Sequence, residues 1–330
     1  MPGDAIRWGI VGTANIARAS FLPGLRAAGG GKAVAVGGRD RARAEEYAAQ
    51  HGIERAIRGY EALVNDDGVD AVYIALPNNL HAEWTMAALR AGKTVLCEKP
   101  LCVSADETEA VLRVAEEMGQ YLWEAFVFPF HDQMKRIREI VGSGEIGTVR
   151  EIQSDFHFKL RSRENIRFKP ELAGGALNDV GCYPVRLAQL SVDGQAEEAT
   201  AVACWAPEGV DEEMQGIVSY GDGSRLVFSC GMQRAYDTFT RYLGTEGELR
   251  LSNPFHPGPS DTLEIHRGER VTVEHPTPDV PSFTRAIQHI HAVMREEEAP
   301  RHLATEDSLP TAVTLDMLHR AANVQQVESP

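Results

Sequence analysis

The first strand-to-helix transition of this 330-residue chain reads Gly9-Ile10-Val11-Gly12-Thr13-Ala14-Asn15-Ile16-Ala17. The stretch keeps the G-x-G-x-x-G spacing, with Ala14 and Ala17 at the second and third glycine positions. Gly12 permits a tight turn, and the small Ala14 lets the backbone approach a pyrophosphate. The free amides and positive dipole at the start of the following helix favour phosphate groups. The stretch therefore predicts a dinucleotide site, with a simple turn of small residues as the alternative interpretation.

Around this turn, the first 120 or so residues alternate apolar strands with amphipathic helices. We predict strands over residues 8–11, 33–36, 71–76 and 94–97, and helices over residues 15–28, 41–50, 81–91 and 104–118. Pro23 is expected to kink or divide the first helix. Strands that read as continuous apolar runs indicate a parallel sheet covered by helices on both faces.

After Ala125 the pattern changes to short strands separated by Gly, Asp, Pro and Asn. We predict helices over residues 132–141, 179–190, 282–297 and 305–322, and strands over residues 216–220, 224–230, 238–243 and 248–251. Gly221-Asp222-Gly223 is typical of a hairpin turn between the first two strands. The predicted fold class is therefore α/β. A Rossmann dinucleotide-binding domain spans residues 1–124, and an α+β domain with a large, mostly antiparallel open sheet spans residues 125–330. The last helix is a candidate to pack back on the first domain, and the site is expected in the cleft between the domains.

Composition excludes several classes of function. The chain is 43% hydrophobic and 25% charged, which is ordinary for a globular protein. It shows no run of eighteen apolar residues and no secretory signal at its start. Five irregularly spaced cysteines suit reduced thiols in a cytoplasmic enzyme. The net charge of −15 opposes nucleic-acid or anionic-membrane binding, so a phosphate-bearing cofactor needs a local positive site.

Arginines after the second strand offer such a positive site. The strand runs into Gly37-Gly38-Arg39-Asp40-Arg41-Ala42-Arg43. The two glycines leave room, and a guanidinium on Arg39 or Arg43 suits the 2′-phosphate of NADP, with each charge-assisted bond contributing about 1.5–3 kcal/mol. Arg41 is better explained as the start of an exposed helix, and Asp40 leaves NAD(H) open. We predict NADP(H) as the preferred cofactor.

Two further stretches carry residues for proton transfer. Cys97-Glu98-Lys99-Pro100 places a lysine at the carboxyl end of a buried strand. Asp179 and Tyr183 are spaced i and i+4, which places them on one face of a helix. A lysine ammonium can stabilise negative charge on a carbonyl oxygen, and a tyrosine hydroxyl can supply a proton. The alternatives are a surface lysine, an aspartate at a helix N-terminus and a packing tyrosine.

Together with Pro77-Asn78-Asn79-Leu80-His81 and Glu98-Lys99-Pro100-Leu101, these stretches resemble the Gfo/Idh/MocA family of oxidoreductases. The resemblance covers nearly the whole chain, and the Glu-Lys-Pro element is its most specific mark. Within the family, the chain is most similar to NADP-dependent nucleotide-sugar 3-ketoreductases. D-xylose dehydrogenases and dihydrodiol dehydrogenases look more distant.

The resemblance implies a role for each matching position. Lys99 and Tyr183 would be the catalytic pair, with Asp179 beside them. Substrate binding would involve Lys99, Asp179 and Tyr183. Arg167, which precedes the glycine pair at positions 174 and 175, is a further candidate for substrate binding because a cation suits a diphosphate-bearing sugar, with a surface salt bridge as the alternative interpretation. The predicted cofactor-binding residues are Gly12, Thr13, Ala14, Asn15, Ile16, Gly38, Arg39, Arg43, Leu76, Pro77, Asn78, His81, Glu98 and Lys99.

The sequence thus predicts an NADP(H)-dependent enzyme that transfers a hydride between nicotinamide and a sugar carbonyl or alcohol, preferably as a nucleotide-sugar 3-ketoreductase. The alternatives are an aldose dehydrogenase of the xylose or glucose type, a trans-dihydrodiol dehydrogenase, and a catalytically silent NADP-binding sensor. The predicted partners are a small sugar or nucleotide sugar, with no nucleic acid, membrane or metal. The spacing of His289 and His291 does not favour a metal pair, because it points them apart on a helix. The resemblance also implies a homo-dimer or homo-tetramer formed through the open sheet.

Overall fold

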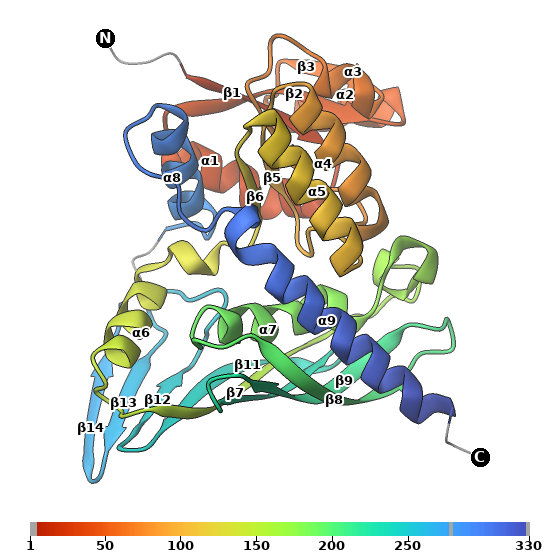
Figure 1. Cartoon of the computed structure of the whole chain (residues 1–330). Helices are drawn as coiled ribbons and strands as arrows, with labels where there is room; N and C mark the ends of the chain where they lie inside the picture. The colour runs from red at the N-terminus through yellow and green to blue at the C-terminus, as the bar shows by residue number, and fades with distance from the viewer. Residues whose placement is uncertain (1–4, 277–279, 328–330) are drawn as a thin grey trace. The chain divides into compact units, whose positions relative to one another are not determined.

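The structure, a computed structural model, describes residues 5–276 and 280–327. The chain divides into two units, each with its own sheet (Figure 1). The first unit joins the described residues up to Cys102 with Asp106–Val127 and Val280–Leu309. The second joins Val103–Ala105 with residues 128–276 and 310–327.

The first unit contains a six-stranded parallel sheet with the order β3-β2-β1-β4-β5-β6. Its strands are β1 (Ile6–Val11), β2 (Gly31–Gly38), β3 (Arg55–Arg58), β4 (Ala71–Ile74), β5 (Thr94–Cys97) and β6 (Leu122–Glu124). Every residue of β4 and β5 is buried, as a sheet covered on both faces requires. This strand order is that of the Rossmann dinucleotide-binding fold, so the predicted fold of this part is confirmed.

Helices connect these strands (Figure 1). They are α1 (Leu22–Ala28), α2 (Arg41–His51), α3 (Tyr60–Val64), α4 (His81–Arg90) and α5 (Ala105–Met118). The helix expected over residues 15–28 is present, but it contains a π-helical turn over Ala17–Phe21 directly before α1. Pro23, which has no backbone N–H to donate, is the second residue of α1 and directly follows the π-helical turn.

A segment near the end of the chain completes the first unit. It contains α8 (Thr284–Met294) and the first residues of α9 (Ala304–Val327). A Cβ on Gly24 of α1 would lie 2.5 Å from the Cβ of Phe283, so glycine permits the close approach of this segment. The Trp8 indole donates to His291 Nε2 over 2.9 Å, and His291 Nδ1 donates to the carbonyl of Gly29 over 2.9 Å. The chain therefore contributes to the first unit at its beginning and again near its end, whereas the sequence predicts a single domain boundary, after residue 124.

The second unit contains an eight-stranded sheet with the order β14-β13-β12-β11-β7-β10-β9-β8. Neighbouring strands are antiparallel except for β7 and β10, which are parallel. The strands are β7 (Val149–Lys159), β8 (Ala196–Trp205), β9 (Asp211–Tyr220), β10 (Arg225–Gly231), β11 (Gln233–Gly244), β12 (Glu248–Leu251), β13 (Leu263–Arg267) and β14 (Arg270–Glu274). The predicted hairpin turn does join β9 to β10, with Gly223 at a φ of 82°.

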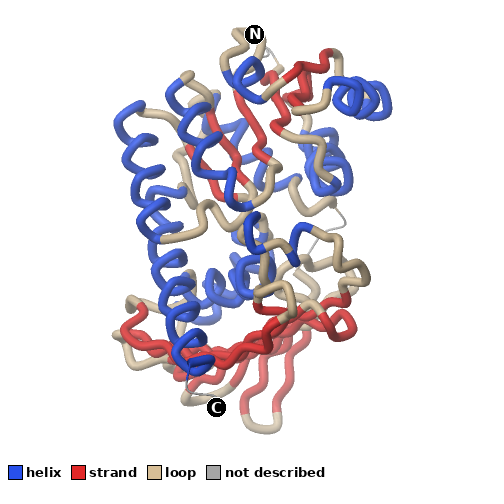
Figure 2. Tube along the Cα trace, turned by 90° about the vertical axis from the view of Figure 1, so that its right-hand side faces the viewer, coloured by secondary structure: helices blue, strands red, loops and turns tan. Residues whose placement is uncertain are grey.

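One face of this sheet is covered and the other is open. The helices α6 (Asp132–Gly142) and α7 (Cys182–Gln189) lie on the same face as the later part of α9 (Figures 1 and 2). On β7, Ile152, Ser154 and Phe156 are buried against these helices, while Glu151 and Gln153 alternate to the other face. No helix of the described residues lies over that other face, which we call the open face.

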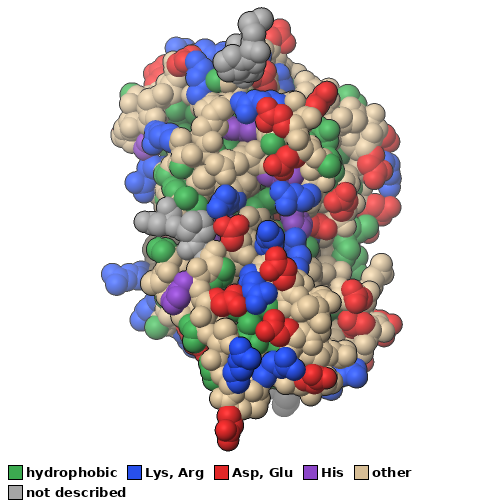
Figure 3. All heavy atoms as spheres, turned by 90° about the vertical axis from the view of Figure 1, so that its left-hand side faces the viewer, with side chains coloured by type: hydrophobic (Ala, Val, Ile, Leu, Met, Phe, Trp, Pro, Cys, Tyr) green, Lys and Arg blue, Asp and Glu red, His purple; other side chains and the backbone are tan. Residues whose placement is uncertain are grey.

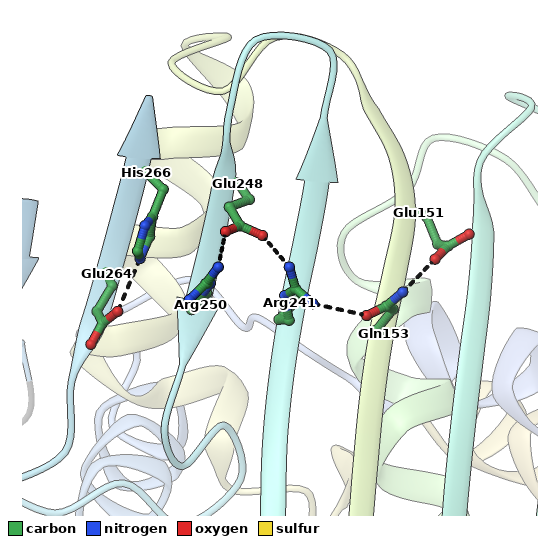
Figure 4. Close-up of polar contacts among 7 residues, drawn as sticks. All are labelled: Glu151, Gln153, Arg241, Glu248, Arg250, Glu264 and His266. Carbon is green, nitrogen blue, oxygen red and sulfur yellow. Dashed lines mark hydrogen bonds and ion pairs between the residues drawn. The ribbon is translucent and has the colours of Figure 1, made fainter. Parts of the chain in front are cut away.

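Polar side chains form a row across the open face (Figure 4). Gln153 donates to Glu151 over 2.7 Å, and Arg241 donates to the Gln153 side chain over 3.5 Å. Arg241 of β11 also pairs with Glu248 of β12, and Arg250, two residues further along β12, contacts the same carboxylate. Partial burial opposes the ionisation of Glu248, but the two arginines prevail and lower its pKa. A further pair, Glu264 and His266 on β13, extends the row.

Candidate active site

The predicted phosphate turn lies at the carboxyl edge of the first sheet. Gly12 has a φ of 102°, and a Cβ on it would lie 2.6 Å from the carbonyl oxygen of Ala75 after β4. Its N–H donates to the carbonyl of Gly37 at the end of β2 over 2.9 Å. Gly12 therefore fits between the ends of two neighbouring strands, and only glycine allows this conformation and approach.

The residues after Gly12 are open to solvent. Thr13 and Ala14 are partly exposed, and Asn15 and Ile16 are exposed at the start of the helix that contains the π-helical turn. The Tyr47 hydroxyl donates to the carbonyl of Ala14 over 3.3 Å and holds this turn against α2. The accessible helix N-terminus, next to a glycine turn, fits the pyrophosphate of a dinucleotide.

The arginines after β2 differ in their contacts. Arg39 is exposed, and no polar partner is found for it among the described residues. Arg41 pairs instead with Glu45 over 2.8 Å. Asp40 accepts a hydrogen bond from the backbone N–H of Arg43 over 3.1 Å and thereby caps α2. The Arg39 and Arg43 guanidiniums remain available for a phosphate, and the Asp40 carboxylate is used by the helix.

Lys99 lies in a turn whose other residues are buried. The turn follows β5, and the peptide bond between Lys99 and Pro100 is cis. The Glu98 N–H donates to the carbonyl of Ile74 over 2.9 Å, and its carboxylate accepts from the Tyr73 hydroxyl. The Leu101 N–H donates to Glu124 Oε1 over 2.8 Å. Lys99 is half-buried, so this anchored turn leaves part of its side chain accessible.

The other predicted cofactor residues of the first unit follow β4, next to this turn. Pro77 and Asn78 are partly exposed, and Leu76 is buried. His81 is fully buried, with Nδ1 2.7 Å from the Pro100 carbonyl and Nε2 2.9 Å from the Leu76 carbonyl. Burial is the main cause that lowers the pKa of His81, and the positive charge of Lys99 acts in the same direction. The direct contact that the sequence predicts between His81 and a cofactor stays a prediction.

Two predicted substrate residues of the second unit contact each other. Asp179 lies in a π-helical turn over Leu177–Gly181, which runs into α7 and Tyr183. The Arg167 guanidinium donates to the Asp179 carboxylate and lies over the Phe158 ring, 5.8 Å from its centroid. The expected helix is thus present, but it opens with a π-helical turn, a feature frequent at functional sites.

Aromatic rings surround Tyr183. Its ring centroid lies 5.2 Å from Phe156, 5.3 Å from Phe255 and 5.5 Å from His256. Phe156 and Phe255 are stacked on each other with an interplanar angle of 7°. Tyr183 is only 9% exposed. These neighbours fix the ring, and the sequence analysis did not foresee them because they come from a distant strand and loop.

The two glycines before this helix, Gly174 and Gly175, leave room for close neighbours, one of which is Asp211, a residue that the sequence does not single out. A Cβ on Gly174 would lie 2.4 Å from the carbonyl oxygen of Arg167, and one on Gly175 would lie 2.1 Å from Asp211 Oδ1. The buried Asp211 carboxylate accepts from the Leu177 N–H over 2.7 Å, at the start of the helix that carries Tyr183. Burial raises the pKa of Asp211 to about 7, although backbone hydrogen bonds oppose the shift. Because neither glycine has a side chain, the backbone can approach the Arg167 carbonyl at Gly174 and the Asp211 carboxylate at Gly175.

Other kinds of site find little support. The five cysteines are free thiols, four of them buried. Across residues 5–276 and 280–327, no three His, Cys, Asp or Glu side chains gather as metal ligands would. In the same described ranges, no helix has the length and apolar character needed to cross a membrane.

Comparison with known proteins identifies both parts of the chain. Residues 6–126 match the model of an oxidoreductase family with an NAD-binding Rossmann fold, and residues 134–250 match the GFO/IDH/MocA C-terminal domain. A D-xylose 1-dehydrogenase (NADP(+)) of Haloferax volcanii is 37% identical over 96% of this chain and 97% of its own length. A dTDP-3,4-didehydro-2,6-dideoxy-alpha-D-glucose 3-reductase of Streptomyces violaceoruber is 36% identical over 98% of this chain and 97% of its own.

Among solved structures, a 3-ketoreductase from Actinomadura kijaniata in complex with NADP and TDP-benzene has a TM-score of 0.89 and 32% identity. The match covers 96% of this chain and 98% of that one. Structures of the same ketoreductase with one tyrosine or one lysine replaced are also similar. By sequence and by structure, the chain therefore belongs to the Gfo/Idh/MocA family of oxidoreductases, and its residues 6–126 form the NAD-binding Rossmann fold of that family.

Proposed function

We propose that this oxidoreductase uses NADP(H) to reduce a sugar carbonyl, and that its preferred substrate is a 3-keto nucleotide sugar. The observation that carries the proposal is the anchored turn of Lys99 at the carboxyl end of β5. In a parallel α/β sheet, ligands bind outside the carboxyl ends of the strands. Lys99, which is partly exposed, follows the carboxyl end of β5, the edge of the sheet at which we expect the cofactor.

The chemistry divides between the cofactor and the chain. A bound nicotinamide supplies the hydride. The Lys99 ammonium stabilises the negative charge that develops on the carbonyl oxygen, and the Tyr183 hydroxyl donates the proton to that oxygen. Asp179, held by Arg167, accepts hydrogen bonds from sugar hydroxyls.

An assay with three groups of substrates tests this function. NADPH oxidation is followed with nucleotide-linked keto sugars and with free keto sugars, and NADP⁺ reduction is followed with D-xylose and other aldoses. We expect the highest kcat/KM for the nucleotide-linked keto sugars. The Haloferax volcanii relative favours the second candidate, an aldose dehydrogenase, which would instead reduce NADP⁺ with a free aldose. Binding of NADPH without turnover of any of these compounds would contradict both and indicate a sensor.

The preference for NADP(H) rests on Arg39 and Arg43. Replacing Arg39 with alanine is expected to raise the dissociation constant for NADPH about 10–100-fold, because one charge-assisted bond to the 2′-phosphate is lost. NADH affinity should change little. Arg41→Ala is the matched control, because that neighbouring arginine already pairs with Glu45. Fluorescence titration measures all four affinities, and equal losses for NADPH and NADH after Arg39→Ala would argue against 2′-phosphate recognition.

We also propose that two or four copies assemble through the open face. Val202, Ile217, Val271 and Val273 are between 44% and 58% exposed. Val202 and Ile217 alternate with buried residues of the covered face, and Val271 and Val273 pair with His266 and Glu264 of the polar row. The polar row contains both signs of charge, so it can pair with the same row of a second copy. Light scattering is expected to give a mass above 36.2 kDa, and Ile217→Lys should reduce it to the mass of one chain. Val313→Lys on α9 is the control, and an unchanged mass for both variants would contradict this interface.

The remaining proposals concern partners and compartment. Free thiols suit the reducing cytoplasm, where we place the enzyme. Figure 3 shows one face of the molecule on which basic and acidic side chains are interspersed. Such a mixture, with the net charge of −15, disfavours nucleic acid as a partner.

A further inference from the structure

His81 joins two turns that the proposed function uses. It begins α4, and its side chain is fully buried. Nδ1 lies 2.7 Å from the carbonyl oxygen of Pro100, in the turn of Lys99. Nε2 lies 2.9 Å from the carbonyl oxygen of Leu76, in the loop after β4. The two strands that precede these turns, β4 and β5, are neighbours in the sheet, so one imidazole connects their carboxyl ends.

This arrangement differs from that of another buried histidine in the same unit. His291 receives a hydrogen bond from the Trp8 indole and donates one to the Gly29 carbonyl, so the neutral ring is satisfied at both nitrogens. His81 instead faces a carbonyl oxygen with each nitrogen. A neutral imidazole has one N–H and satisfies one of these acceptors, whereas the protonated ring satisfies both. In either form, the hydrogen atom of His81 is directed at a turn of the site.

The contact with Pro100 complements the other anchors of the turn. The backbone of Glu98 is held by Ile74, and the backbone of Leu101 is held by the buried Glu124. Neither of these hydrogen bonds involves the carbonyl of Pro100, the residue after Lys99. His81 Nδ1 contacts that carbonyl, while its Nε2 faces the Leu76 carbonyl on the neighbouring loop.

We propose that His81 is a positioning residue for Lys99, which fixes the lysine turn relative to the loop after β4 without touching the substrate. The inference rests on the proposed function of Lys99 and deepens it. A displacement of about 1 Å in a catalytic group can lower the rate about 100-fold. The role of His81 is therefore expected to appear in kcat, through the placement of the ammonium.

The test uses His81→Phe, which removes both polar contacts of the imidazole and keeps an aromatic ring at this position. In the active wild-type background, kcat is expected to fall about 100-fold while NADPH still binds. In the Lys99→Ala background, the same substitution is expected to leave the residual kcat unchanged, because His81 acts through Lys99. His291→Phe is the matched control, since it removes two hydrogen bonds of a buried histidine away from the turn. It should lower the melting temperature and leave kcat largely unchanged.

His81→Gln supplies a second variant with an amide N–H for one of the two carbonyls, and its kcat should lie between those of the wild type and His81→Phe. An equal loss of kcat from His81→Phe with and without Lys99 would overturn the proposal. So would failure of both His81 variants to fold or bind NADPH when His291→Phe does both, since His81 would then serve the fold alone. A wild-type chain without turnover would instead refute the proposed function, so the two failures are distinguishable.

Discussion

Lys99→Ala is expected to reduce kcat about a thousandfold while leaving NADPH binding largely intact. The reason is that removing one group that stabilises a developing oxyanion costs about 10²–10³ in kcat, and the ammonium carries a full charge. The turn itself should survive, because its backbone anchors at Glu98 and Leu101 do not use the lysine side chain. Steady-state kinetics with the preferred keto sugar and NADPH fluorescence titration measure the two effects.

The chain offers a matched control at the opposite end of the same strand. Lys93 precedes β5, is only 7% exposed, and donates to the carbonyls of Asp66 and Val69 over 2.8 Å each. Lys93→Met should lower the melting temperature and leave kcat close to that of the wild type. If Lys99→Ala retained wild-type turnover, or if both lysine variants lost turnover equally, the catalytic assignment of Lys99 would be wrong.

Tyr183→Phe is expected to lower kcat about 10²–10⁴-fold, which is the range that a positioned proton donor contributes. Phenylalanine keeps the ring contacts with Phe156, Phe255 and His256, so the effect should isolate the hydroxyl. NADPH affinity should be unchanged, because the predicted cofactor residues all lie in the first unit. Single-turnover measurement of NADPH oxidation separates the chemical step from product release.

Tyr242→Phe is the corresponding control in the second unit. Tyr242 is fully buried on β11, and its hydroxyl contacts the Ser191 hydroxyl at 3.0 Å. Loss of this hydroxyl should affect stability and not kcat. Undiminished kcat in Tyr183→Phe would exclude the tyrosine as the proton donor and direct attention to His256, the titratable ring beside it.

The first unit could be predicted well because its signals are local. Gly12 needs a positive φ, and the strands around it are continuous apolar runs whose order follows from their alternation with helices. The short strand β3 and the helix α3 were missed. Arg55–Arg58 has charged ends and only two apolar residues, so its composition resembles a loop, and pairing with β2 decides its structure.

The sheet of the second unit was harder to predict for a related reason. The central strand β7 was missed because its open-face positions, such as Glu151, Gln153 and Asp155, carry polar groups that break up the apolar pattern. One of these side chains has its partner on another strand: Gln153 accepts a hydrogen bond from Arg241 of β11. Such cross-strand partners are distant in sequence, so composition alone gives no sign that they are present.

Candidate site residues can be proposed from the sequence where a motif specifies them, but not where packing does. Lys99, Asp179 and Tyr183 are candidates because of their spacing and because of the resemblance to a family, and their roles stay a prediction. Asp211 was missed, because nothing near it indicates that its carboxylate caps a helix formed by residues well before it in the chain. The glycine pair at positions 174 and 175 did signal a close approach of some kind, but only the fold identifies Asp211 as the group that approaches.

The second entry of the chain into the first unit has a consequence for synthesis on the ribosome. Most of the Rossmann domain is translated first. Two of its parts are translated near the end: His291, which accepts a hydrogen bond from Trp8, and the segment around Phe283, which packs on Gly24. A nascent chain that has passed Glu124 still lacks these residues, so its α1 surface stays uncovered until most of the second unit has emerged. The domain that begins translation is therefore among the last to be completed, and a recombinant fragment that stops near residue 124 would expose the same apolar surface.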